Sequence, residues 1–91
     1  MAKKREQTRH TDAAFYKQER EDFFVGNPVG CRSDNILWAS WGEGGLICMY
    51  STGPYTYPCS RHQAEAFASA PSKMGFIHDE YLSRGVRGTK G

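Results

Sequence analysis

The sequence predicts an α+β fold, in which a three-stranded antiparallel β-meander packs against one C-terminal helix and an amphipathic helix precedes the sheet. Short apolar runs of strand length, separated by glycine-containing turns, lie between about residues 35 and 57. A capping box directly after them, from Ser60 to Gln63, indicates the start of a helix. With 91 residues the chain has room for one small domain.

The N-terminal part divides into an arm and a helix. Residues 1–10 are polar and basic and offer nothing to bury, so we expect a flexible arm. Thr11-Asp12 can cap a helix that runs to about Phe24, within an amphipathic segment 11–26. Phe15 and Phe23 fall on one face of this helix, whose other positions are mainly charged. Proline at position 28 favours an end just before it.

The three predicted strands follow in order. The first covers about residues 35–41, and the glycine-rich turn 42–45 leads into the second, residues 46–50. The third strand is short, Tyr55 to Tyr57, because prolines bracket it on both sides. Proline is confined to edge positions in sheets, so this strand is expected at an edge.

Two helical segments complete a domain that we assign to residues 30–85. The first runs over residues 61–70 and ends at Pro71. The spacing of apolar residues over 76–82 predicts a second short helix that ends at Gly85. Residues 86–91 are expected to form a flexible tail.

Charge, cysteine content and the lack of long apolar runs indicate where the protein is located. The net charge of +2 is mildly basic, with Lys3, Lys4 and Arg5 clustered at one end. Three cysteines cannot all pair within one chain, and neither a signal peptide nor a run of about 20 apolar residues is present. We therefore expect a cytoplasmic protein with no membrane partner. The oligomeric state stays open.

Neither a metal site nor a catalytic site is predicted. Cys59 and His62 have ligand-like spacing, and Cys31 and Cys48 could complete a tetrahedral set. Zinc modules typically use two close pairs, however, and Cys48 lies in an apolar strand. Cys59 could act as a nucleophile with His62 or His78 as the base, but no motif typical of such enzymes surrounds these residues. We expect no metal, no cofactor and no enzymatic activity.

Residues 33–82 contain an ordered set of short motifs. These are Ser33-Asp34-Asn35-Ile36, an aromatic at Trp41, the strand Leu46-Ile47-Cys48-Met49-Tyr50, the pair Tyr55-Thr56-Tyr57, and Ala70-Pro71-Ser72-Lys73-Met74-Gly75. Together they resemble the KTSC domain, which is found at the C-terminus of some lysyl-tRNA synthetases and as free-standing small bacterial and phage proteins. The resemblance implies a small α+β module for which RNA binding has been proposed.

A nucleic-acid interface is our first functional prediction. Tyr55 and Tyr57 point the same way from a strand and could stack on unpaired bases, unless they belong to the core. Arg61, Lys73 and the basic arm would then hold the phosphates. The expected partner is RNA or another single-stranded nucleic acid.

A protein partner is the alternative. Phe15 and Phe23 could enter a groove on another protein as anchors of the amphipathic helix. In this interpretation the chain is a phage-type interaction module or inhibitor that acts on a host enzyme or complex.

Overall fold

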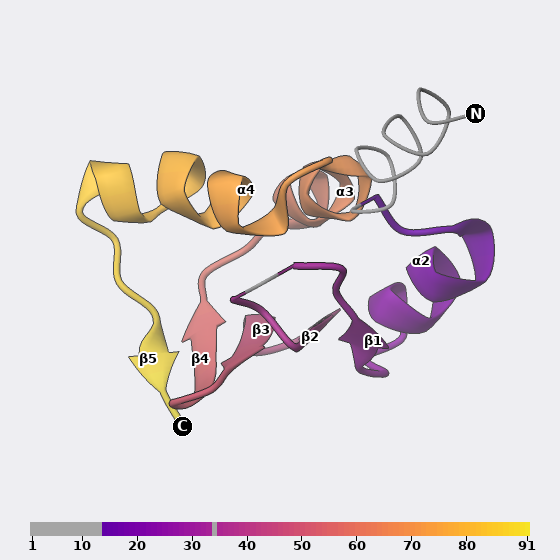
Figure 1. The fold of residues 1–91 in the computed structure, drawn as a ribbon, viewed down its shortest axis with the longest axis horizontal. Coiled ribbons are helices and arrows are strands. Elements are labelled where there is room, and N and C mark those ends of the chain that lie inside the picture. Colours follow the sequence, from indigo (N-terminus) through magenta and orange to yellow (C-terminus); the bar gives the residue numbers. More distant parts are fainter. Residues whose placement is uncertain (1–13, 34) are drawn as a thin grey trace, which may run out of the picture.

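The computed structural model describes residues 14–33 and 35–91, and it confirms the α+β class (Figure 1). The predicted arm 1–10 and the predicted Thr11-Asp12 cap lie outside these residues. Within them, three α-helices and one short 3-10 helix accompany a single antiparallel sheet.

The sheet has five strands in the order β1-β2-β3-β4-β5, rather than the three that the sequence predicts. The strands are β1 (Val29–Gly30), β2 (Trp38–Gly42), β3 (Gly45–Tyr50), β4 (Gly53–Tyr57) and β5 (Thr89–Lys90). Strands β2, β3 and β4 form a continuous meander in which Cys48 lies opposite both Ala39 and Tyr55. Each overlaps one of the predicted strands.

Strand β4 is not an edge strand. The two residues of β5 pair with it on the side away from β3, with Tyr55 opposite Lys90 and Thr56 opposite Thr89. Pro54 is compatible with this because it takes part through its carbonyl oxygen, which accepts a hydrogen bond of 2.9 Å from the Gly91 N–H, so its missing N–H is not needed there. The segment 86–91, expected as a loose tail, thus contributes a strand to the sheet.

The helices begin where local caps place them. Helix α2 (Lys17–Phe24) starts after Tyr16, whose backbone N–H donates to Glu19 at 2.9 Å. Helix α3 (Arg61–Ser69) has the predicted capping box between Ser60 and Gln63, with both reciprocal hydrogen bonds formed. These satisfied N–H groups fix the start of α3.

A second C-terminal helix, α4 (Lys73–Glu80), begins earlier than the sequence predicts. The Ser72 hydroxyl accepts a hydrogen bond from the Gly75 N–H at 3.0 Å and caps it. The 3-10 helix η1 (Leu82–Arg84) follows and ends at Gly85 in the left-handed conformation (φ 79°), as expected for a glycine C-cap.

The helices lie on one face of the sheet and enclose the core. Figure 1 shows α3 and α4 over the strands of the sheet, with α2 beside β1. The core is aromatic where the layers meet: Phe23 stacks on Phe67 at 5.6 Å, and the Tyr57 and Tyr81 rings meet at a tilt of 31°, 5.0 Å between ring centroids. Among the residues that the structure describes, no helix covers the other face of the sheet, which we call the helix-free face.

Phe15 and Phe23 belong to this core and not to a protein-binding helix face. Phe23 is fully buried and Phe15 is 9% exposed, and their rings contact each other and Phe67. Burying both rings within the domain leaves neither available as an anchor for another protein. Their prediction as partner-contacting residues is wrong for this fold.

Candidate nucleic-acid interface

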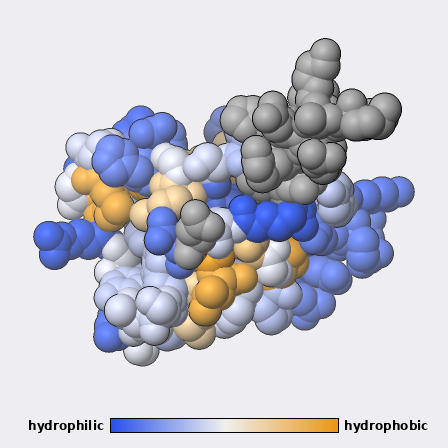
Figure 2. Space-filling model, in the orientation of Figure 1, coloured by the Kyte–Doolittle hydropathy of each residue, from blue (hydrophilic) through white to orange (hydrophobic). Residues whose placement is uncertain are grey.

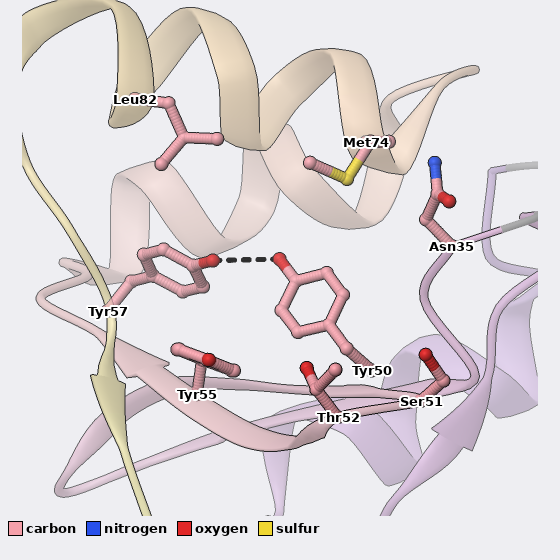
Figure 3. A pocket seen from close by; sticks show the side chains of 8 residues that line it. All are labelled: Asn35, Tyr50, Ser51, Thr52, Tyr55, Tyr57, Met74 and Leu82. Carbon is pink, nitrogen blue, oxygen red and sulfur yellow. Dashed lines mark hydrogen bonds between the residues drawn. The ribbon is translucent and has the colours of Figure 1, made fainter.

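A cleft between the sheet and helix α4 gathers most of the protein's tyrosines. Alternation along a strand places Tyr55 and Tyr57 on the face that the helices cover, and the pairing of β3 with β4 brings Tyr50 beside them. We call the space in front of them the tyrosine cleft. It is lined by Asn35, Tyr50, Ser51, Thr52, Tyr55, Tyr57, Met74 and Leu82 (Figure 3).

The tyrosine cleft has the size of a site for one small group. Its volume is about 340 Å³, near the lower end of the range of about 300–1,000 Å³ that is usual for ligand sites. Figure 3 shows the ring of Tyr50 projecting between the strands and Met74, with Ser51 and Thr52 at the rim. Aromatic walls with hydroxyl and amide groups at the mouth suit a flat, polar ligand.

The three tyrosines are not equally accessible. Tyr57 is only 3% exposed, whereas Tyr50 and Tyr55 are half-buried. The Tyr50 and Tyr57 hydroxyls form a hydrogen bond of 2.7 Å, and the ring of Tyr55 meets Tyr50 edge-on at 5.5 Å. Tyr57 therefore positions Tyr50, while Tyr50 and Tyr55 offer surface to a ligand.

Backbone close to the tyrosines holds them in place. A Cβ atom at Gly88 would come within 2.9 Å of the Tyr57 ring and 3.0 Å of the Tyr55 Cβ. The segment leading into β5 can pass over these side chains only because this residue is glycine.

The Tyr50 and Tyr57 hydroxyls stay protonated near neutral pH. Burial, as the main cause, raises the pKa of both groups.

A polar groove continues from the cleft past the start of α4. Its lining residues are Arg32, Ser33, Asn35, Pro71, Ser72, Lys73 and Met74, and it encloses about 440 Å³. Asn35 and Met74 line both spaces, so the groove and the cleft are neighbours. Arg32 holds its guanidinium there by hydrogen bonds of 3.0 Å to Glu19 and 2.8 Å to the Ala14 carbonyl.

Lys73 borders this groove but is not a surface cation. It is 1% exposed, and its Nζ donates to the carbonyl oxygens of Ala68 at 3.3 Å and Ala70 at 2.9 Å. The ammonium also lies 4.4 Å from the centre of the Phe15 ring. Burial lowers the pKa of Lys73 to about 8. The predicted role of Lys73 in holding phosphates does not fit this position, because the side chain caps the C-terminus of α3 instead.

Arg61 is exposed but lies away from the tyrosines. Its guanidinium sits 4.3 Å from the centre of the Phe24 ring and 5.8 Å from that of Trp41. None of these three residues lines the tyrosine cleft. The structure thus does not bring the predicted arginine and the predicted tyrosines into one site. The remaining predicted contacts, Lys3, Lys4 and Arg5, fall outside the described residues.

The helix-free face of the sheet carries apolar side chains of intermediate exposure. Trp38 lies opposite Met49, and Ile47 lies opposite Thr56, all on this face. On the side of the molecule that Figure 2 shows, hydrophobic residues form separate small areas within a largely hydrophilic surface.

The thiols and carboxylates form no metal centre in the described part of the chain. Within residues 14–33 and 35–91, no three His, Cys, Asp or Glu side chains are grouped so that they could hold a metal ion. The three cysteines are free thiols. Burial raises the pKa of Cys59, which disfavours the thiolate that a nucleophile needs.

Among the described helices, none is both long enough and apolar enough to cross a membrane.

Tyr50, Met74 and Leu82 line the cleft but are not among the site residues that the sequence predicts. Tyr50 could have been found, because strand alternation and antiparallel pairing bring it to the Tyr55 face. The positions of Met74 and Leu82 depend on how α4 crosses the sheet, which no local pattern specifies.

Comparisons of the chain with protein-family models, with curated proteins and with solved structures found no match.

Proposed function

We propose that this protein is a small, non-catalytic module that binds single-stranded nucleic acid, and RNA in preference to DNA. An unpaired base would occupy the tyrosine cleft. The observation that carries the proposal is the pair Tyr50 and Tyr55, partly exposed beside hydroxyl and amide groups in a cleft of about 340 Å³. Proteins that bind single strands commonly stack unstacked bases on such aromatic side chains.

Two further features support the proposal. The polar groove beside the cleft, with Arg32 at its border, offers a path for a sugar–phosphate chain on one side of a bound base. The resemblance of residues 33–82 to the KTSC domain points to the same class of partner. Lys3, Lys4 and Arg5 would add phosphate contacts and make binding sensitive to salt.

A binding measurement with one altered tyrosine tests this function. We expect a fluorescein-labelled single-stranded RNA of ~10 nucleotides to bind by anisotropy, with an affinity that falls steeply between about 50 and 200 mM salt. Tyr55→Ala should weaken binding about 5- to 150-fold, because one aromatic–base stack contributes about 1–3 kcal/mol.

Thr56→Ala is the matched control, since Thr56 is the next residue of β4 and faces the opposite side of the sheet. It should bind RNA like the unaltered protein. Unfolding curves establish that both variants are folded. A folded Tyr55→Ala protein with unchanged RNA affinity would contradict the proposal.

A protein partner is a second candidate, favoured by the partly exposed Trp38, Ile47 and Met49 on the helix-free sheet face. A phage-type module acting on a host enzyme or complex would use this face and not the buried Phe15 and Phe23. Ile47→Lys should then abolish capture of that partner but leave RNA binding intact. Such an apolar contact should change little with salt.

A further inference from the structure

A second hollow lies between α2 and the start of α3, and it shares no residue with the tyrosine cleft. It encloses about 310 Å³ and is lined by Lys17, Arg20, Glu21, Phe24 and Arg61. Three of these side chains are cationic and one is anionic, so the lining carries a formal charge of +2. The hollow has an aromatic wall and an excess of positive charge.

The two arginines are held in place by the same neighbours. The Arg20 and Arg61 guanidiniums lie 5.3 Å and 4.3 Å from the centre of the Phe24 ring. Both also pair with Glu65, Arg20 through Oε1 and Arg61 through Oε2, the latter at 3.4 Å. One oxyanion therefore already bridges two guanidiniums that the ring helps to orient.

Charge compensation at this site is incomplete. Two guanidiniums share the single carboxylate of Glu65, and Lys17 and Glu21 add one charge of each sign, so these five side chains keep a formal charge of +1. The side chains of Arg20 and Glu65 are each 37% exposed, so an anion from solvent can reach them. Arginine presents planar pairs of donors that match phosphate oxygens as well as carboxylate oxygens.

We infer that this hollow is a phosphate-binding site in which the incoming phosphate displaces the Glu65 carboxylate from Arg20 and Arg61. The phosphate can belong to a nucleic-acid backbone or to a small free phosphate compound. The inference does not depend on the tyrosine cleft, and each can hold without the other.

The test follows the arginine side-chain Nε–Hε signals by NMR during separate titrations with pyrophosphate and with single-stranded RNA. Saturable shifts of the Arg20 and Arg61 signals with pyrophosphate are expected. The same shifts with RNA identify backbone phosphate as a ligand, whereas shifts with pyrophosphate alone identify small phosphates. The absence of saturable shifts in both titrations would overturn the inference.

Three variants define the roles of the residues. Arg61→Gln should weaken pyrophosphate binding about 10-fold or more, because it removes charged donors. Arg84→Gln, an exposed arginine in η1, is the control and should leave binding unchanged. Glu65→Gln should bind pyrophosphate several-fold more tightly, since the internal competitor has lost its charge. Weaker binding by Glu65→Gln would contradict the displacement.

The outcomes separate this site from the proposed function. RNA that shifts the tyrosine signals but leaves Arg20 and Arg61 unmoved, with no pyrophosphate binding, supports the cleft and rejects the phosphate site. Pyrophosphate binding at the arginines without any RNA binding supports the phosphate site and rejects the proposed binding of nucleic acid in the cleft.

Discussion

At the scale of single residues, Lys73 shows how position changes the role of a charge. In the sequence it is one more cation in a mildly basic chain, yet in the fold its ammonium faces carbonyl oxygens and the Phe15 ring. That environment exists only because the segment before α2 packs against the end of α3, where the Phe15 N–H donates to the Ala68 carbonyl. Neither neighbour of Lys73 in sequence reveals this.

The lowered pKa of Lys73 predicts a specific pH dependence. Its folded value of about 8 lies below its ordinary value of 10.5. Between these two pH values the unfolded chain binds more protons at this residue, so its contribution to stability rises with pH. The free energy of unfolding of the unaltered protein minus that of Lys73→Met should therefore become more positive from pH 7.5 to 10.5 in urea titrations.

A difference for Lys73→Met that stays constant or shrinks over this pH range would mean that Lys73 is solvated in the folded protein.

The Tyr81 hydroxyl gives a second prediction at this scale. It is buried and has no hydrogen-bond partner among the described N and O atoms, and burial, followed by the nearby Cys59 thiol, raises its pKa. A thiol is a weak partner, so most of the cost of burying the hydroxyl is uncompensated. Tyr81→Phe should keep the stack on Tyr57 and stabilise the protein by about 1 kcal/mol or more in thermal or urea unfolding.

Tyr57→Phe is the informative counterpart, because it removes a hydroxyl that is hydrogen-bonded to Tyr50. It should destabilise by about 1 kcal/mol. Equal losses of stability in the two phenylalanine variants would contradict the assignment of one satisfied and one unsatisfied hydroxyl.

At the scale of elements, the turn between β2 and β3 depends on Gly45. Its φ is +112°, and a Cβ there would lie 2.3 Å from the Tyr57 carbonyl oxygen on the next strand. Gly45→Ala should cost at least about 1–3 kcal/mol from backbone strain alone, with the clash in addition. Chemical unfolding measures this loss.

The neighbouring Gly44 supplies the matched control for that prediction. It has no positive φ, and a Cβ there would meet no atom within 4 Å. Gly44→Ala should leave the free energy of unfolding nearly unchanged. Similar losses for the two alanine variants would show that the turn does not have this geometry.

Elements with a complete local signal could be predicted from the sequence, and the others could not. The Ser60–Gln63 capping box and the following alanine and phenylalanine stripe define α3 within one residue of the expected end. Strand β5 has only two residues and pairs with Tyr55 and Thr56 over a large sequence separation. Its existence depends on tertiary contact and not on any pattern in residues 86–91.

At the scale of the whole molecule, stability should fall in alkali. Burial raises the pKa of Cys31 to about 11, and it also raises the pKa values of two other thiols and three tyrosines. A raised folded pKa contributes stability that is complete below the unfolded pKa and is lost as pH rises towards the folded value. As pH rises, the stability lost through these six groups opposes the stability gained through Lys73.

The free energy of unfolding under reducing conditions should therefore decrease between about pH 9 and pH 11. Urea titrations at three pH values across this range measure it. A stability that is flat or rising above pH 9 would show that these thiols and hydroxyls are exposed in the folded protein.

The candidate site also belongs to this largest scale. The sequence predicts that Tyr55 and Tyr57 share a face, and the structure confirms it, since both line the tyrosine cleft. Which face the helices cover is decided by the packing of Phe23 on Phe67 and Tyr57 on Tyr81, between residues distant in sequence. For this reason the tyrosines that a ligand can reach are Tyr50 and Tyr55 rather than the predicted pair Tyr55 and Tyr57. Trp38 is partly exposed on the helix-free face.

The most direct measurement of the central claim compares the two faces of the sheet in one experiment. The tyrosine ring signals and the Trp38 indole signal are followed by NMR while single-stranded RNA is added. The base-binding cleft predicts saturable shifts of the Tyr50 and Tyr55 rings, with the Trp38 indole unchanged. Shifts of the Trp38 signal with unmoved tyrosine rings would contradict the cleft and place binding on the helix-free face.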